Sequence, residues 1–516
     1  MKLSDLLDGV VEPLEPFEMA DGARRIDLDR FETLDALDTI EIRALAIDHR
    51  EVTEGALFAC VPGARHDGHD HAAEAAERGA IALLVERAVD VEPPVVQILA
   101  RDVRAVVGPI AARLYGNPAD ALRVVGITGT NGKTTVAHLV GAIVGATGAR
   151  AATIGTLGAR WSGDQRSTGF TTPEAPALQA MLATMRDEGV DTVAMEVSSH
   201  ALDLHRVDGI RFAVVAFTNL SPEHLDLHGD LESYFAAKSR LFEAAFTARG
   251  VICVDDQWGL RLARSARASL SSVVTVASMP TADRESVDIY ADAVRSTPDG
   301  VRFELVDGSA RWPVAMRLLG RFNVANAIVA YAVARQLSIQ PEAIVAALSK
   351  VDPVPGRLER VENDRGITLV VDYAHTPDAL SVVLANLREL APTPARVIAV
   401  YGCGGDRDRS KRGPMGRAVA RGADIAIVTS DNPRSESPAS IIDEVVRGLA
   451  VDDPRPIVEV DRRAAIARAI ALASPGDVVV IAGKGHETGQ TIGDTQHPFD
   501  DRVVAAECVA LGGPAR

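Results

Sequence analysis

Short runs of valine and isoleucine alternate with longer, amphipathic stretches rich in alanine and leucine along most of this 516-residue chain. Strands buried on both faces read as continuous apolar runs, so this alternation is typical of parallel strands covered by helices. The candidate strands are residues 123–128, 192–197, 213–218, 368–373, 398–402, 425–430 and 478–483. Nothing repeats at a fixed period, which argues against a solenoid. We therefore predict an α/β fold built on parallel sheets.

The pattern divides the chain into three segments. At roughly 150 residues per domain, this length suggests about three domains. The sequence before about residue 105 differs in character from the rest of the chain and precedes the first phosphate-loop motif. Prolines and glycines in 352–366 interrupt a helical pattern before a new strand, which indicates a second break. We expect domains at residues 1–105, 106–351 and 352–516.

The composition argues against several classes of protein. Asp and Glu outnumber Lys and Arg by 71 to 54, and the resulting net charge of −17 disfavours nucleic-acid binding. No apolar run reaches the ~18 residues of a membrane span, and the acidic start is unlike a signal peptide. The four cysteines lie far apart, have no paired spacing for a zinc site and are too few for a disulfide framework. We expect a cytoplasmic monomer that binds no nucleic acid and does not insert into a membrane.

Residues 126–136, GITGTNGKTTV, follow a predicted strand and precede an apolar helix. In that context a glycine-rich loop directs its backbone amides at a phosphate. Lys133 can neutralise terminal phosphates, and the hydroxyl of either following threonine can bind magnesium. The match to the Walker pattern is irregular, because Ile127 stands where that pattern has its first glycine. The alternative is a glycine turn beside a surface lysine, but the context favours a nucleotide loop.

The string TGTNGKTT resembles the nucleotide loop of the Mur ligases and the folylpolyglutamate synthetases, which join an amine to an ATP-activated carboxylate. Further motifs resemble the MurE-type branch, the UDP-N-acetylmuramoyl-tripeptide synthetases. They are found, in order, at residues 195–202, 217–229, 234–242, 320–327, 354–359, 371–380, 431–436 and 483–487. The resemblance implies the three-domain Mur ligase architecture. This architecture begins with an N-terminal domain that binds uridine. A central P-loop ATPase domain with a parallel sheet comes next, and a C-terminal Rossmann-like domain binds the incoming amino acid.

The implied reaction is the ATP-dependent addition of meso-2,6-diaminopimelate to the D-Glu of UDP-MurNAc-L-Ala-D-Glu, during cytoplasmic synthesis of peptidoglycan precursors. The carboxylate attacks the γ-phosphate of ATP, and the amine then displaces the acyl phosphate. Because a carboxylate approaching a polyphosphate is repelled, Mg²⁺ and nearby cations must screen the charge. Residues on both later domains approach ATP, so we expect the C-terminal domain to close and exclude water.

The resemblance gives catalytic roles to Lys133, Glu196, His224 and Lys238. It places Mg²⁺ on Thr134, Glu196, His224 and Lys238, the lysine being carbamylated. Glu196 and His224 follow predicted strands, where α/β sheets place their sites. Taken alone, each residue has a plainer interpretation. Glu196 could be a capping carboxylate, His224 a structural histidine and Lys238 a solvated lysine on a helix.

Two further sets follow from the resemblance. The ATP contacts are Gly129, Thr130, Asn131, Gly132, Lys133, Thr134, Thr135, Asn326, Arg357, Asp372 and His375. The contacts to the UDP-MurNAc-dipeptide are Ile47, His49, Ala64, Arg65, His66, Thr171, Thr172, Ser198 and Arg206. Two departures affect the second set: Asp48, His49 and Arg50 stand for the family's Asp-Ser-Arg, and Leu204 stands for a glutamine.

The amino-acid contacts implied by the resemblance are Arg407, Asp431, Asn432, Pro433, Arg434, Gly483 and Glu487. The planar guanidinium of Arg434 can bind a carboxylate through two parallel hydrogen bonds. Diaminopimelate has a second carboxylate at its far end, whereas the ammonium-bearing end of lysine would be repelled. We therefore predict diaminopimelate as the substrate; the plainer interpretation of Arg434 is a surface arginine beside a turn.

Three alternatives remain. The same ligase could add L-lysine or another diamino acid. A folylpolyglutamate synthetase is less favoured, because that family lacks the uridine-binding domain. A non-catalytic ATP-binding regulator could lose the catalytic set, yet Lys133, Glu196, His224 and Lys238 are all present.

Overall fold

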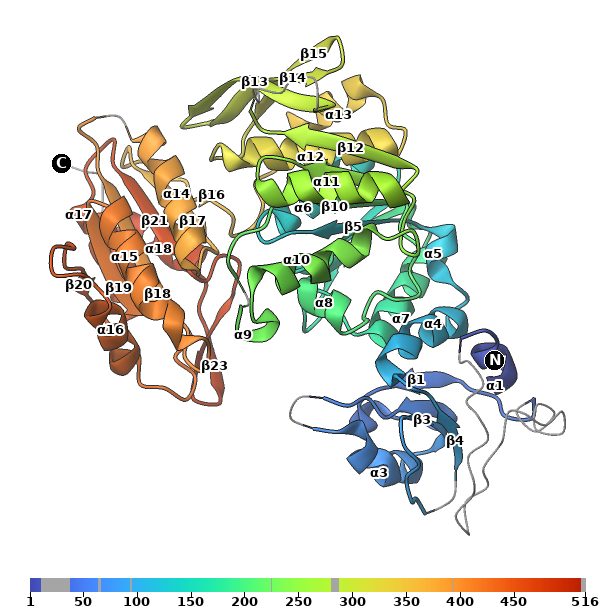
Figure 1. The fold of residues 1–516 in the computed structure, drawn as a ribbon. Coiled ribbons are helices and arrows are strands. Elements are labelled where there is room, and N and C mark those ends of the chain that lie inside the picture. Colours follow the sequence, from blue (N-terminus) through green and yellow to red (C-terminus); the bar gives the residue numbers. More distant parts are fainter. Residues whose placement is uncertain are drawn as a thin grey trace.

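The computed structural model describes residues 1–10, 38–63, 66–92, 95–223, 225–279, 287–391 and 393–511. Three bodies, each built on one large sheet, follow one another along the chain, and a two-stranded hairpin completes the third (Figure 1). The central body lies between the other two in this view, with the N-terminal body below it and the C-terminal body to its left. No helix among these residues has both the length and the apolar character that crossing a membrane requires.

The N-terminal sheet has four parallel strands in the order β1-β2-β3-β4. The strands are β1 (Ala44–Ala46), β2 (Ala56–Ala59), β3 (Ala80–Val85) and β4 (Val96–Leu99). The helices are α1 (Leu3–Leu7), α3 (Ala72–Glu77) and α4 (Val103–Leu114), with the short 3-10 helices η1 (His49–Glu51) and η2 (Gly68–His71). Apolar clusters cover both faces of the sheet, so β2 is buried along its whole length.

The central sheet has eleven strands in the order β15-β14-β13-β12-β11-β10-β5-β9-β6-β7-β8. Its strands are β5 (Arg123–Thr128), β6 (Ala151–Gly155), β7 (Gly158–Trp161), β8 (Asp164–Arg166), β9 (Thr192–Glu196), β10 (Val214–Phe217), β11 (Arg249–Cys253), β12 (Ser272–Ala277), β13 (Ile289–Thr297), β14 (Gly300–Asp307) and β15 (Ala310–Met316). The middle of the sheet is parallel, and antiparallel pairs extend it at both edges.

Helices cover both faces of the central sheet. They are α5 (Pro118–Ala121), α6 (Lys133–Ala146), α7 (Ala175–Asp187), α8 (Ser199–Asp203), α9 (Leu225–His228), α10 (Leu231–Ser239), η3 (Arg240–Phe242), α11 (Gln257–Ser269), α12 (Phe322–Gln336) and α13 (Pro341–Leu348). One apolar cluster joins α6, α12 and α13 to the sheet, and a second joins α7, α10 and α11 to the opposite face. Strand β5 lies between β9 and β10, so the loops at the carboxyl ends of these three strands meet at one edge.

The C-terminal sheet has six strands in the order β16-β17-β21-β18-β19-β20, and only β16 is antiparallel to its neighbour. The strands are β16 (Glu359–Arg360), β17 (Thr368–Asp372), β18 (Val397–Cys403), β19 (Ile425–Ser430), β20 (Ile457–Val458) and β21 (Val478–Ala482), followed by the hairpin β22 (Gly489–Ile492) and β23 (Thr495–Pro498). The helices are α14 (Pro377–Leu390), η5 (Arg409–Lys411), α15 (Arg412–Gly422), α16 (Pro438–Arg447), α17 (Arg462–Leu472) and α18 (Asp501–Leu511). Helices α14, α15 and α16 pack on one face, and α17 and α18 pack on the other.

The predicted fold class is confirmed, and all seven predicted strands form to within a residue at each end. The antiparallel edges of the central sheet are an addition to the predicted parallel sheet. The proposed boundary near residue 105 lies at the start of α4, which begins at Val103.

Candidate active site

The phosphate loop connects the buried strand β5 to helix α6, and its two glycines are required by the space around them. Gly129 and Gly132 have φ angles of 144° and 90°. A Cβ on Gly129 would lie 2.0 Å from Thr218 Oγ1, and one on Gly132 would lie 2.3 Å from Asn326 Oδ1. The loop can therefore pass close to its neighbours only with glycine at both positions. It places the amino end of α6 at the sheet edge, where backbone amides can bind phosphate.

Two lysines meet at this loop. Lys133 Nζ donates to the carbonyl oxygens of Gly129 at 2.8 Å and Thr130 at 2.7 Å. Lys238, on α10, is 1% exposed, and its Nζ donates to the same Gly129 oxygen at 2.9 Å. Burial lowers the pKa of Lys133, while burial and then the charge of Lys133 hold the pKa of Lys238 well below its usual range. An amine in this position is readily neutral, unlike the solvated lysine of the plainer interpretation.

Glu196 ends strand β9, which pairs with β5, so its carboxylate lies beside the loop. Its two oxygens accept from the backbone N–H of Thr156 at 2.8 Å and from Thr156 Oγ1 at 3.2 Å. The charges of Glu196 and Glu223 both raise the pKa of Lys133. Glu223 was not among the predicted residues, although it lies within the motif at residues 217–229. His224, the residue after it, lies outside the described residues.

The C-terminal body contributes an arginine to the loop. Arg357 Nη2 donates to Thr134 Oγ1 at 3.1 Å, and its guanidinium lies 4.5 Å from the centre of the Tyr373 ring. Asp372 accepts from the backbone N–H groups of Leu358 and Ala374, each at 2.7 Å. These bonds hold the backbone immediately after Arg357 and immediately after Tyr373. Burial raises the pKa of Asp372 despite the nearby charge of Arg357.

The predicted ATP set therefore gathers around one edge. Residues 129–135 form the loop and the first turn of α6, and Thr218 Oγ1 donates to the Asn131 carbonyl at 2.6 Å. Asn326, on α12, donates to Asn323 Oδ1 at 2.8 Å, and its own Oδ1 faces Gly132. His375 Nδ1 donates to the Tyr373 carbonyl at 2.8 Å, and burial lowers the pKa of this histidine.

A second group lies on the other side of Glu196. Thr172 Oγ1 donates to the Glu196 carbonyl at 2.9 Å and accepts from the Ser198 backbone N–H at 3.1 Å. Arg206 donates to the Thr172 carbonyl at 3.1 Å and pairs with Glu174 at 2.6 Å. Thr171 Oγ1 lies 3.3 Å from Thr156 Oγ1. The four predicted residues of the central body are thus contiguous with Glu196.

The remaining residues of the predicted nucleotide-substrate set belong to the N-terminal body. Ile47 follows β1 and is half-buried, His49 opens η1, and His66 is exposed. Ala64 and Arg65 lie outside the described residues.

The predicted amino-acid contacts are linked by a lysine that sequence reasoning missed. Lys484 is fully buried, and its Nζ donates to Asn432 Oδ1 at 3.2 Å, Glu487 Oε2 at 2.9 Å and the Gly489 carbonyl at 2.6 Å. Asn432 Nδ2 donates to Glu487 Oε2 at 2.8 Å. Lys484 therefore fixes which way the Asn432 amide and the Glu487 carboxylate face.

Arg434 lies beside this network. Its φ is 52°, its Nη1 donates to the Gly405 carbonyl at 2.7 Å, and it is half-buried. Asp431 and Pro433 are buried on either side of Asn432, and a Cβ on Gly483 would lie 2.7 Å from Asp431 Oδ2. Arg407 is exposed in the loop after β18.

His486, which sequence reasoning also missed, lies where the central and C-terminal bodies meet. Its ring centre is 5.3 Å from that of Tyr373. Burial and the charge of Arg357 lower its pKa to about 4, although a backbone hydrogen bond with Thr156 acts in the opposite direction. The folded chain therefore holds His486 neutral at pH values where a free histidine is protonated.

This difference predicts an acid-sensitive stability. Between about pH 6.5 and pH 4 the unfolded chain binds a proton at His486 that the folded chain does not, so stability falls as the pH falls through this window. The free energy of unfolding that is lost between pH 7 and pH 4.5 should be about 2 kcal/mol smaller in His486→Gln than in the unaltered chain. Thermal unfolding at the two pH values measures it, with the exposed His497→Gln as the matched control. Equal pH dependence in both variants would contradict the assignment.

Family models match nearly the whole described chain. "Mur ligase family, catalytic domain" matches residues 41–139, "Mur ligase middle domain" matches 127–334, and "Mur ligase, glutamate ligase domain" matches 356–485.

Curated relatives and solved structures agree with these matches. The chain is 43% identical over 471 residues to a UDP-N-acetylmuramoyl-L-alanyl-D-glutamate–2,6-diaminopimelate ligase from Syntrophomonas wolfei, covering 90% of this chain and 94% of that protein. It is 44% identical over 479 residues to the Streptomyces coelicolor protein of the same name, covering 91% and 92%. A solved structure of a ligase with this name has a TM-score of 0.67 at 34% identity, covering 92% of this chain and 96% of that one. Mycobacterium tuberculosis folylpolyglutamate synthase, complexed with ADP and AMPPCP, shares the fold with a TM-score of 0.60 at 19% identity over 79% of this chain and 95% of that one.

Proposed function

The chain belongs to the Mur ligase family, and from this we propose that it is the ATP-dependent ligase that adds meso-2,6-diaminopimelate to UDP-MurNAc-L-Ala-D-Glu. The bond formed is an amide between an amino group of diaminopimelate and the D-Glu carboxylate. We propose that the enzyme acts as a monomer in the cytoplasm, where ATP and nucleotide-linked precursors are available. We assign residues 1–105 to uridine binding, 106–351 to ATP binding and 352–516 to the amino acid. The three large sheets, spanning 44–99, 123–316 and 359–482, support this division.

The observation that carries the proposal is the meeting of two bodies at the phosphate loop. Arg357 of the C-terminal body reaches Thr134 of the loop, while Lys133 and Lys238 converge on the Gly129 carbonyl. Arg357 and Lys133 place two cations at one loop, and these suit a polyphosphate attacked by a carboxylate, because each lowers the repulsion between them. Contact between the bodies also helps to exclude water from an acyl phosphate, which water would hydrolyse.

The residues around the loop also fit a magnesium ion. Glu196 offers carboxylate oxygens and Thr134 a hydroxyl, and both are buried at the sheet edge. A hard ion prefers such oxygen donors. Lys238 as an amine is a poor ligand, but as a carbamate it would present oxygens at the same edge. We propose these three residues with His224 as the ligands; Mg²⁺ bound there would supply positive charge against the phosphates.

We propose that the remaining contacts orient the two acceptor groups. Thr171, Thr172, Ser198 and Arg206 lie beside Glu196, so a dipeptide held there presents its carboxylate towards the loop. Asn432, Glu487 and Arg434 lie near the carboxyl ends of the C-terminal strands, where an amino acid can bind.

The direct test is ATP-dependent phosphate release by the purified protein with UDP-MurNAc-L-Ala-D-Glu. We expect release with meso-diaminopimelate and little with L-lysine, L-ornithine or no amino acid, and a tripeptide product by mass. A higher kcat/KM for lysine or ornithine would keep the ligase and overturn the assigned amino acid. If no amine supports release, the enzymatic function is wrong.

Replacing Lys484 should weaken binding of the amino acid. Lys484→Met removes one of the two donors to each of Asn432 Oδ1 and Glu487 Oε2, and it removes the donor to the Gly489 carbonyl. A lost hydrogen bond to a charged group costs about 1.5 to 3 kcal/mol. We expect KM for diaminopimelate to rise roughly 10- to 100-fold while KM for ATP stays the same. Steady-state kinetics with each substrate varied measures the split. An equal rise in both values would show a general folding defect instead.

A further inference from the structure

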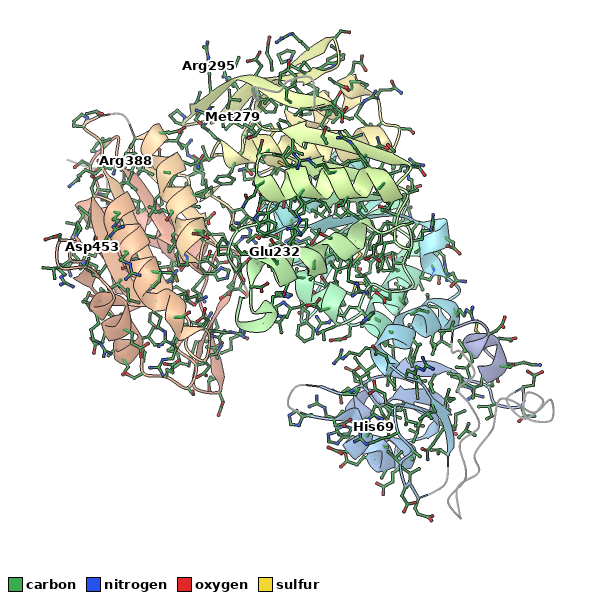
Figure 2. All side chains as sticks on the ribbon, in the orientation of Figure 1. His69, Glu232, Met279, Arg295, Arg388 and Asp453 are labelled. Carbon is green, nitrogen blue, oxygen red and sulfur yellow. The ribbon has the colours of Figure 1, made fainter. Side chains whose placement is uncertain are left out.

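A cluster of two histidines and a glutamate lies in the N-terminal body, away from the phosphate loop. His49 opens η1, His71 ends η2, and Glu74 lies in the first turn of α3. His69, labelled in Figure 2, lies in the same 3-10 helix as His71 and shows where the cluster is found. Nothing in the proposed ligase reaction uses His71 or Glu74.

The local fold brings these side chains together. Asp48 accepts from the Arg50 backbone N–H and so caps η1, and Asp67 accepts from the His69 backbone N–H and caps η2. Helix α3 continues directly from η2, so His71 and Glu74, three residues apart, lie on the same side of its first turn. The two short helices thus present a histidine each to one carboxylate.

The spacing of the ligand atoms matches that around a tetrahedral ion. His49 Nε2 lies 3.0 Å and His71 Nδ1 lies 3.5 Å from Glu74 Oε2, and all three ligand atoms lie within 4.8 Å of one another. Bonds of about 2.0 to 2.1 Å at tetrahedral angles separate neighbouring ligand atoms by roughly 3.3 Å. The separations of 3.0 Å and 3.5 Å fall on either side of that value.

The rings of His49 and His71 stack against each other. Their centres are 4.3 Å apart and their planes differ by 14°. His71 Nδ1 is buried and makes no hydrogen bond within the part of the chain that the structure describes. To share an ion the rings must turn so that their lone pairs meet, and this torsion, between a tetrahedral and a planar carbon, is a soft one.

We propose that His49, His71 and Glu74 form a binding site for a transition-metal ion of the zinc class. Two imidazoles and one carboxylate suit Zn²⁺, Co²⁺ or Ni²⁺, whereas Mg²⁺ prefers an all-oxygen set. Three protein ligands leave a fourth position for water or an anion. Because the ion joins η1 to α3, binding stabilises the folded N-terminal body. This site is separate from the proposed magnesium ligands. It shares His49 with the predicted contacts to the UDP-MurNAc-dipeptide, whereas His71 and Glu74 belong to neither set.

The test uses the full chain, freed of metal with a chelator and kept in millimolar Mg²⁺ to occupy oxygen-rich sites. Titration with Zn²⁺ by calorimetry should give one ion per chain that His71→Phe and Glu74→Gln each weaken by at least about tenfold. Titration with Co²⁺ should give the visible absorption of a tetrahedral site, lost in both variants. His497→Gln, at an exposed histidine of β23, serves as the control and should bind as the unaltered chain does.

The two variants also separate binding from folding. His71→Phe keeps an aromatic ring against His49, and Glu74→Gln keeps the shape of an exposed side chain. Their unfolding temperatures without zinc should match that of the unaltered chain, and only the unaltered chain should gain stability with zinc. The proposal is overturned if the unaltered chain binds no zinc beyond that bound by the variants.

Discussion

Lys238→Ala should lower kcat by on the order of a thousandfold while the protein stays folded. The unaltered side chain is buried at the Gly129 carbonyl, and its lowered pKa favours the neutral amine. A neutral amine adds to CO₂, forming an N–C bond and releasing a proton, and so becomes an anionic carbamate. Alanine can provide neither the amine nor the carbamate oxygen that we assign to magnesium.

Dependence on carbon dioxide distinguishes this role from a structural one. Protein prepared in CO₂-free buffer should gain activity when bicarbonate is added, and the gain should increase with pH as more of the amine becomes neutral. Lys238→Ala and Lys238→Arg should not respond, and their unfolding temperatures serve as the folding control. Full activity in CO₂-free buffer, or in Lys238→Ala, would contradict the carbamate.

The phosphate loop could be predicted from sequence because its signal is local. A buried strand, two glycines and an apolar helix follow one another within residues 123–146, and each follows from the properties of adjacent residues. The same holds for the six other strands that were predicted, whose apolar runs are continuous. The strand order could not be predicted, because β5 pairs with β9 and β10, which follow it by more than sixty residues.

The surroundings of the site residues depend on such long-range pairing. Lys238 belongs to a helix with no marked apolar face in its sequence, and its amine is buried against the carbonyl of Gly129, 109 residues away. Lys484 and His486 lie in the motif at residues 483–487, yet only the folded chain places Asn432 and Tyr373 against them. The resemblance predicts the direct contacts, and the structure adds neighbouring residues that hold the predicted ones in place.

The edges of the central sheet were missed for a related reason. Strands β13 and β15 alternate more buried with less buried residues, as antiparallel strands with one covered face do, and exposed or half-buried residues also interrupt β14. A search for continuous apolar runs passes over such strands. They lie far from β5 in the sheet order, so their omission left the predicted site unaffected.

Arg434→Ala should remove about 2 to 5 kcal/mol of transition-state stabilisation, which lowers kcat/KM for diaminopimelate roughly 30-fold to several thousandfold. We propose that the guanidinium binds the far carboxylate of this substrate through two parallel hydrogen bonds. One of its nitrogens already donates to the Gly405 carbonyl, which holds the side chain beside Asn432. Removing it leaves the substrate carboxylate without a partner in a half-buried site.

Assays with diaminopimelate and with L-lysine distinguish two roles for Arg434: binding the substrate carboxylate, or only supporting the loop that contains Gly405. Arg434→Lys keeps the positive charge without the planar pair of donors. Its kcat/KM for diaminopimelate should therefore lie between that of the unaltered enzyme and that of the alanine variant. Alanine at φ 52° keeps the backbone strain that arginine has there, so the comparison is not confounded by relief of strain. Arg434→Ala should also reduce the preference for diaminopimelate over L-lysine. The guanidinium that attracts the far carboxylate also repels the ammonium group of lysine, and both effects are lost together. Equal losses for both amino acids, with KM for ATP unchanged, would instead show that Arg434 serves only to hold Gly405 in place.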